Sequence, residues 1–148
     1  MRRPPLAILA AALAFAAAGC GDDSLSAHDL RARASRICAR TATATDRIPL
    51  PSTFDEGARF LRAGAAEMSP AVRRLRALRA PHDLRTSYAQ AVALRAREIG
   101  LIAGQARAID AGADPIDAYR ALQAQLAPLT RMEDATWRAL RVAACVAR

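Results

Sequence analysis

Few residues in this chain have types and spacing that could do chemistry, and the cysteines come first among them. Cys20 stands in the stretch FAAAGCGDD, between an apolar run and two acids, while Cys38 and Cys145 lie far from it in the sequence. A thiol can act as a nucleophile, a metal ligand, a cross-link or a modification site. No cysteine has a second cysteine or a histidine at the spacing of a zinc site or a haem attachment motif, so these residues do not predict metal or haem binding.

The histidines and serines give weaker signals than the cysteines. His28 and His82 both lie near expected helix starts, and no H-x-x-x-H, E-x-x-H or glycine-rich phosphate loop accompanies them. Ser69 and Ser87 have no partner histidine in a recognisable pattern. We therefore expect no metal, no cofactor and no enzymatic activity, and an active site assembled from distant residues remains the third hypothesis for function.

A run of basic residues, VRRLRALRAPHDLR, is the clearest candidate binding surface. Its first four arginines are called the arginine cluster below: Arg73, Arg74, Arg76 and Arg79. On a helix, residues three apart are neighbours, so these side chains form a basic face. Such a face predicts contact with lipid headgroups, an acidic wall polymer or an acidic envelope protein. The alternative is a solvated face in a chain whose 22 basic residues are all arginine. Nucleic acid is disfavoured because no aromatic residues interleave the arginines.

The N-terminus is typical of an export signal. Arg2 and Arg3 precede an uncharged apolar segment at 6–18, and small residues follow it. This segment is shorter than the roughly 20 residues that a helix needs to span a bilayer. A buried N-terminal helix is the alternative, but Arg-Arg-Pro-Pro is a poor start for one.

The residues Ala17, Ala18, Gly19 and Cys20 resemble the lipobox of bacterial lipoproteins, although Ala17 stands where that family prefers leucine. The resemblance covers only the first twenty residues. It implies that the Cys20 thiol receives a diacylglycerol, that a peptidase cuts just before it, and that further acylation such as palmitate completes the anchor. It places the protein outside the cytoplasm, anchored by lipid to the bacterial cell membrane. The alternative is ordinary secretion after Ala18 or Gly19.

This interpretation divides the chain into a signal peptide at 1–19, a polar tether at 20–26 and a helical domain at 27–148. Cleavage removes Arg2 and Arg3 and no acid, so the mature net charge is 8 − 2 = +6. No segment shows the alternation of β-branched residues that a strand needs, and we expect an all-α, up-down four-helix bundle with kinked helices.

The predicted helices are marked by capping residues and prolines. The first covers about 28–46 with Ser26 as N-cap, and the second follows Thr53 and continues with a kink through Pro70, where a new helix start is the alternative. The third starts at Pro81 and is capped by Gly112, and the fourth starts at Asp114-Pro115 and kinks at Pro128. Arg95 interrupts the apolar face of the third helix, so we expect its stem to be buried and its guanidinium to reach water. The predicted apolar face of the fourth helix consists of Ile116, Tyr119, Leu122, Leu126, Leu129, Met132 and Leu140.

Cys38 and Cys145 are an even pair in an exported chain, which predicts a disulfide bond. Two buried free thiols are the alternative. A straight fourth helix would carry Cys145 tens of ångströms from Cys38, because each residue adds about 1.5 Å. We therefore expect either the bond together with marked bending or staggering of the helices, or straight helices and no bond.

Two functions remain open at this stage. The first is a non-enzymatic envelope lipoprotein that binds a partner or an anionic surface. The second is a bundle that holds a small ligand between its helices, with Tyr88, Tyr119, Met132 and Trp137 as candidate lining residues. A filled core favours the first function, and a deep cavity with convergent polar groups favours the second.

Overall fold

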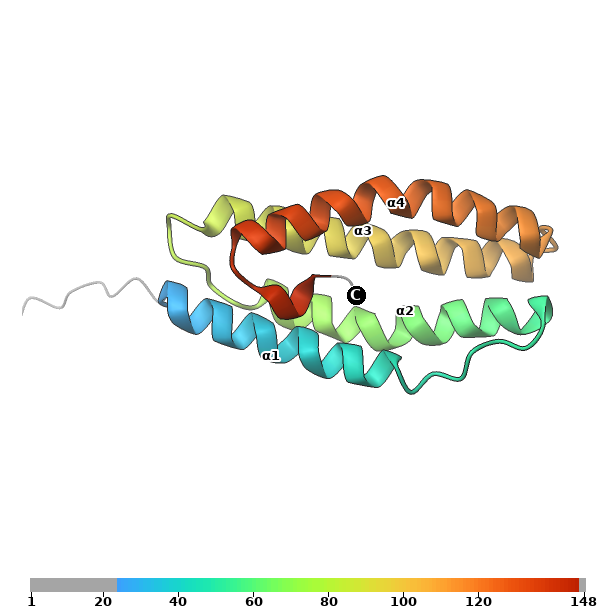
Figure 1. Cartoon of the computed structure of the whole chain (residues 1–148), viewed down its shortest axis with the longest axis horizontal. Helices are drawn as coiled ribbons and strands as arrows, with labels where there is room; N and C mark the ends of the chain where they lie inside the picture. Colours follow the sequence, from blue (N-terminus) through green and yellow to red (C-terminus); the bar gives the residue numbers. More distant parts are fainter. Residues whose placement is uncertain (1–23, 147–148) are drawn as a thin grey trace, which may run out of the picture.

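The computed structural model describes residues 24–146, apart from the side chains of Phe54 and Asp55, and it confirms an all-α fold. The predicted signal peptide and Cys20 lie outside the described residues. Four long helices follow one another up and down, and a short 3₁₀ helix follows the last (Figure 1). Their bounds are Ala27–Thr45 for α1, Phe54–Arg76 for α2, Arg85–Asp110 for α3, Pro115–Ala139 for α4 and Ala143–Cys145 for η1. None of the helices among the described residues is both long and apolar enough to cross a membrane.

The predicted N-caps of three helices are confirmed. Ser26, Thr53 and Asp114 each accept a hydrogen bond from the backbone N–H three residues later. The start of the third helix is wrong by four residues, because α3 begins at Arg85 rather than at Pro81. The Leu84 N–H bonds to the Pro81 carbonyl, three residues back, so the chain forms a tight turn before the α-helical pattern begins.

Both internal prolines lie within continuous helices. Pro70 is inside α2 and Pro128 is inside α4, which confirms the expectation of one second helix rather than two. Buried side chains follow each proline directly: Ala71 and Val72 come after the first, and Leu129 comes after the second.

The C-terminus reverses direction, which the sequence did not predict. α4 ends at Ala139, six residues before Cys145, and Arg141 adopts φ 60°. The N–H groups of Arg141 and Val142 bond to the carbonyls of Arg138 and Trp137, which is the Schellman pattern of helix ends. The chain then turns back toward the middle of α1 (Figure 1). A fourth helix that runs straight to Cys145 is therefore wrong.

The core has two parts, one toward each end of the bundle. We call the end that holds Ser24, the start of α1 and the α2–α3 connection the proximal end, and the opposite end the distal end. The larger core cluster lies in the proximal half around Leu30, Leu75 and Trp137. The smaller lies in the distal half and consists of Leu61, Ala106 and Leu122, with partly buried side chains around it. α1 packs on α2 and η1, and η1 in turn contacts α4.

The predicted apolar face of α4 needs two corrections. Ile116 and Met132 are 47% and 51% exposed, whereas Glu133 and Trp137 are almost fully buried. The buried positions Leu129, Glu133 and Trp137 are spaced by four residues, so one face of the helix carries them. A prediction that places only apolar residues on the buried face leaves out Glu133 and includes its neighbour Met132 instead.

Candidate functional site

The predicted disulfide is present. Cys38 of α1 and Cys145 of η1 are bonded, with Cα atoms 5.1 Å apart and a sequence separation of 107 residues. The reversal at Arg141 brings Cys145 back to Cys38. The turn after α4, rather than a kink within a helix, therefore removes the separation of tens of ångströms that a straight fourth helix would give. Arg31 also holds the reversed segment, because its Nε donates to the Leu140 carbonyl at 2.9 Å.

A buried polar cluster lies where α3 meets α4. The carboxylate of Glu133 is 1% exposed as a residue and accepts hydrogen bonds from Arg95 Nε and from Trp137 Nε1, the latter at 2.6 Å. Arg95 also donates to the Cys145 carbonyl, and it forms an ion pair with Glu133. The guanidinium is therefore bonded within the protein, whereas we expected it to lie in water, and the Arg95 side chain keeps only 20% of its surface exposed. Arg95 therefore links α3, on which it lies, to α4 through Glu133 and to η1 through Cys145.

A second carboxyl joins this cluster and changes its charge. Glu98 on α3 hydrogen-bonds Glu133 and accepts from the Thr130 hydroxyl. Burial, with this hydrogen bond, raises the pKa of Glu133 to about 8, although the charge of Arg95 acts in the opposite direction. At neutral pH the pair of carboxyls therefore retains a proton. The cluster is enclosed among helices and linked to the C-terminal segment, which is the arrangement of a structural network.

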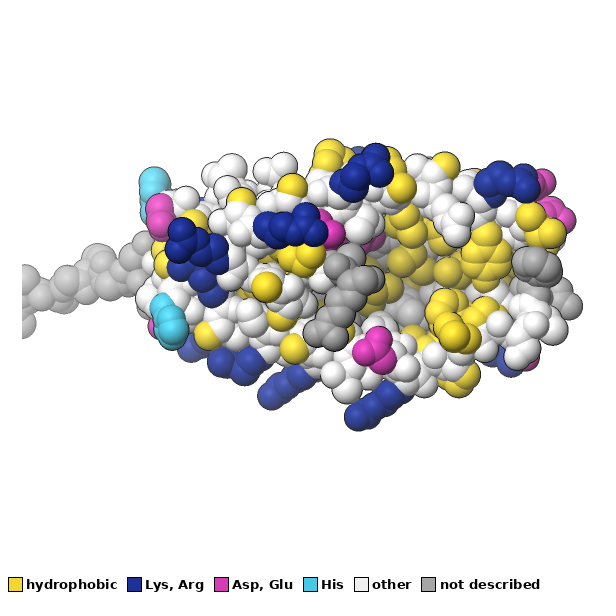
Figure 2. Space-filling view, viewed as in Figure 1, with side chains coloured by type: hydrophobic (Ala, Val, Ile, Leu, Met, Phe, Trp, Pro, Cys, Tyr) yellow, Lys and Arg dark blue, Asp and Glu magenta, His cyan; other side chains and the backbone are white. Residues whose placement is uncertain are grey.

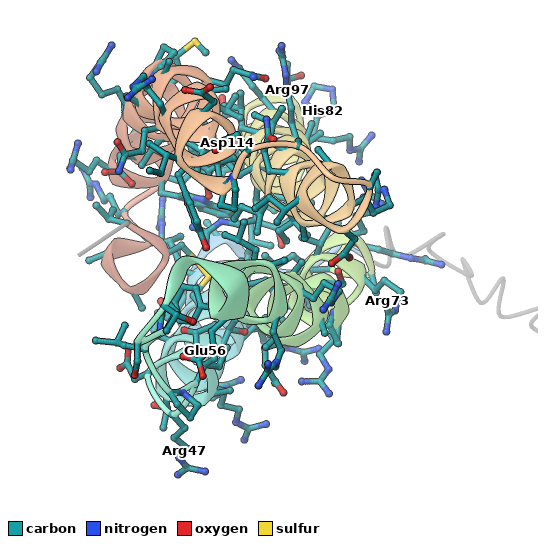
Figure 3. All side chains as sticks on the ribbon, turned by 90° about the vertical axis from the view of Figure 1, so that its right-hand side faces the viewer. Arg47, Glu56, Arg73, His82, Arg97 and Asp114 are labelled. Carbon is teal, nitrogen blue, oxygen red and sulfur yellow. A yellow bond between two sulfur atoms is a disulfide. The ribbon has the colours of Figure 1, made fainter. Side chains whose placement is uncertain are left out.

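The arginine cluster is fully on the surface. Arg73, Arg74, Arg76 and Arg79 are all exposed, while Leu75 between them and Val72 just before them are buried. Within the described residues, no carboxylate pairs with Arg73, Arg74 or Arg76. Three of these side chains lie in the last turn of α2, where positive charge also complements the helix dipole. Figure 3 shows Arg73 directed away from the bundle axis.

Further arginines from α1 extend this basic surface. Arg33, Arg36 and Arg40 on α1 and Arg74 on α2 line one groove, with a volume of about 400 Å³. Basic side chains follow the outer edge of α1 in Figure 2. The sequence carried a signal for them, since positions 33, 36 and 40 share one helix face. Like charges so close together repel one another, and a bound anion would relieve this repulsion.

A pocket lies at the proximal end, between the α2–α3 connection and α3. It has a volume of about 480 Å³. Its lining includes the arginines Arg76, Arg79 and Arg85, the apolar side chains of Leu78 and Val92, and Ser24 at the start of the described chain. The Leu25 N–H donates to the Arg79 carbonyl at 2.8 Å, so the entering chain is fixed beside the arginine cluster. The last residues of the predicted tether thus belong to the folded domain.

The four residues proposed to line a deep ligand cavity do not meet. Tyr88 and Trp137 pack edge-to-face in the core with ring centroids 5.9 Å apart, and the Tyr88 hydroxyl donates to the Leu75 carbonyl. Tyr119 packs against the distal cluster, and Met132 is on the surface. His28 and His82 are exposed near the proximal end. Among the described residues, no group of three His, Cys, Asp or Glu side chains could hold a metal ion.

Comparison with protein-family models, with curated proteins and with solved structures finds no match to this chain.

Proposed function

We propose that this protein is an envelope lipoprotein whose helical domain has no enzymatic role and binds an anionic surface through its proximal end. The observation that supports the proposal is the position of the arginine cluster. The Leu25 amide bonds to the Arg79 carbonyl, so the point where the chain enters the domain and the exposed arginines share one end of the bundle.

A lipid on Cys20 would hold this end at the membrane. Cys20 lies four positions before Ser24. A fully extended chain spans at most about 3.6 Å per residue, so the two are at most roughly 14 Å apart. Arginine fits anionic headgroups well, because its planar guanidinium binds phosphate in a bidentate manner. Lipid anchoring by one acyl chain is marginal, so a basic surface next to the anchor adds a second membrane-binding element.

Lipidation is tested by metabolic labelling with a fatty acid in a bacterial host. The wild-type chain should incorporate the label, and Cys20→Ser should not, whereas Cys38→Ala should still be labelled because that thiol belongs to the disulfide. A label that persists in Cys20→Ser would overturn the anchor and leave ordinary secretion.

Surface binding is tested with residues 20–148 carrying Cys20→Ser, a chain that keeps every described contact. This chain should float with vesicles containing anionic phosphatidylglycerol and not with vesicles of phosphatidylcholine alone. Binding should weaken with salt, because exposed charges are screened over about 8 Å at physiological ionic strength.

The decisive variant is the triple replacement Arg73→Gln, Arg76→Gln and Arg79→Gln, which should abolish flotation. The matched control, Arg97→Gln, Arg107→Gln and Arg131→Gln, removes the same charge from exposed positions on α3 and α4 and should retain most of the binding. Circular dichroism checks that both variants remain folded. Equal binding by both triple variants would contradict the proposal and leave the arginine cluster as a solvated face.

A further inference from the structure

The pocket at the proximal end combines two properties that rarely occur together on a solvated helix face. Leu78, Tyr88 and Val92 give it an apolar floor, and Arg76, Arg79 and Arg85 line it with positive charge. Its volume of about 480 Å³ lies within the range of roughly 300–1,000 Å³ that is typical of small-molecule sites. A purely cationic surface for polymers would not need the apolar floor.

We propose that this pocket binds one molecule of an anionic phospholipid, with its phosphate among the three arginines and the first part of an acyl chain on the apolar floor. The inference rests on the proposed function, because the membrane is then within reach of the pocket. Ser24 lines the pocket itself, so a lipidated Cys20 would place its mouth within roughly 14 Å of the anchor.

Charge complementarity decides between the possible occupants. The lipid that the lipobox resemblance implies for Cys20 is a diacylglycerol, which carries no charge to match Arg76, Arg79 and Arg85. A free phosphate matches the arginines but leaves Leu78 and Val92 without a partner. Only an anionic amphiphile satisfies both parts, since an arginine such as Arg76 or Arg85 can donate two parallel hydrogen bonds to phosphate oxygens.

The protein has a built-in reporter for this pocket. Trp137 is the only tryptophan of the chain, and its buried ring packs edge-to-face on Tyr88, which lines the pocket. An acyl chain against Tyr88 would change the surroundings of this ring pair and shift the Trp137 emission. The Tyr88 hydroxyl is bonded to the Leu75 carbonyl, which holds the ring in place.

The experiment titrates residues 20–148 carrying Cys20→Ser with short-chain phosphatidylglycerol below its critical micelle concentration. Phosphatidylcholine with the same chains and inorganic phosphate are the comparison ligands. Trp137 emission should change saturably with phosphatidylglycerol, at least tenfold more weakly with phosphatidylcholine, and not at all with phosphate. Equal affinity for the two lipids, or phosphate binding as tight as that of phosphatidylglycerol, would overturn the proposal.

Two variants locate the bound lipid. Arg79→Gln with Arg85→Gln should weaken phosphatidylglycerol binding about tenfold or more, and Ala89→Leu should block it by filling the pocket from an exposed lining position. Ala124→Leu, at an exposed position on α4, is the matched control and should bind like the parent chain. Binding that is unchanged in Ala89→Leu would contradict occupation of this pocket.

The outcomes also separate this inference from the proposed function. Flotation with anionic vesicles but no saturable response to monomeric phosphatidylglycerol would refute the pocket and keep the surface. A saturable response to monomeric phosphatidylglycerol without flotation would keep the lipid pocket and refute binding to the anionic membrane surface. If the lipidated protein in neutral detergent already shows the shifted emission and takes up no phosphatidylglycerol, the pocket holds the protein's own acyl chain and the inference is wrong.

Discussion

The proximal and distal halves of this bundle are built differently. The proximal half has α1 on one side, η1 turned back into the bundle, a disulfide and the Glu133 cluster. The distal half has no cover from α1, which ends at Thr45, and its buried cluster is small. Figure 2 shows apolar side chains in an open hollow on that half. Cross-links and buried networks therefore reinforce the end that carries the arginine cluster.

The disulfide should account for the largest difference between the halves. Replacing both Cys38 and Cys145 by alanine should lower the free energy of unfolding by roughly 2–5 kcal/mol, because chain-entropy models give about 4.7 kcal/mol for a loop near 100 residues. Urea unfolding of both proteins measures this, and reduced wild type is the control, since it should match the double variant. A loss below 1 kcal/mol would show that packing alone holds η1 in place.

Loss of the Glu133 carboxyl should have the next largest effect. Glu133→Ala leaves the Arg95 guanidinium and the buried Trp137 N–H without the oxygen that accepts their hydrogen bonds, and it should cost about 3 kcal/mol. Glu133→Gln keeps an oxygen to accept from Arg95 and Trp137, so its loss should be much smaller at pH 7. Equal losses in the two variants would contradict this, because they would show that the amide oxygen of glutamine does not replace the carboxyl.

The same residue makes stability depend on pH. The pKa of Glu133 is raised to about 8 by burial, so the native state holds a proton that the unfolded chain loses near pH 4.5. This contribution is complete below about pH 4.5 and is lost as the pH rises through about 8. Urea midpoints at pH 5, 6.5, 8 and 9 should therefore fall for the wild type, whereas Glu133→Gln should remove most of this decline. A wild-type midpoint that rises over this range would contradict the assignment.

The smallest expected effect is in the distal half, and it has the opposite sign. Among the described residues, the buried Tyr119 hydroxyl has no hydrogen-bond partner, and it lies next to Gly57, where an added Cβ would be 1.8 Å from its oxygen. Tyr119→Phe removes an unsatisfied polar atom and should raise the free energy of unfolding by about 1 kcal/mol. Tyr88→Phe is the control in the proximal half and should destabilise, because that hydroxyl bonds to the Leu75 carbonyl. A destabilised Tyr119→Phe would contradict this contrast between the halves.

Helix ends show how far the sequence could predict this fold. α3 and α4 both end in Schellman motifs, with Gly112 at φ 96° in one and Arg141 at φ 60° in the other. Glycine adopts this conformation without strain, so the first end was predicted correctly. Arginine adopts this conformation only at a cost in free energy. The disulfide and the buried side chains of Val142 and Cys145 hold the reversed segment and offset that cost. Contacts between residues far apart in the sequence determine where α4 ends, and the local sequence pattern does not reveal them.

The candidate site was predictable only in part. The arginine cluster followed from spacing on α2 alone, but the pocket needs the α2–α3 connection to fold beside Ser24 and α3. The Glu133 cluster was missed because a buried glutamate looks like a surface residue until Arg95 and Trp137 are placed around it.

Hydrogen–deuterium exchange with and without phosphatidylglycerol vesicles tests the central claim most directly, because it reports which end of the domain meets the membrane. With residues 20–148 carrying Cys20→Ser, amides of the α2–α3 connection at 77–84 should exchange more slowly on binding. Amides of the two distal connections, at 46–53 and 111–114, should exchange at unchanged rates. Protection of the distal connections with no change at 77–84 would contradict the account.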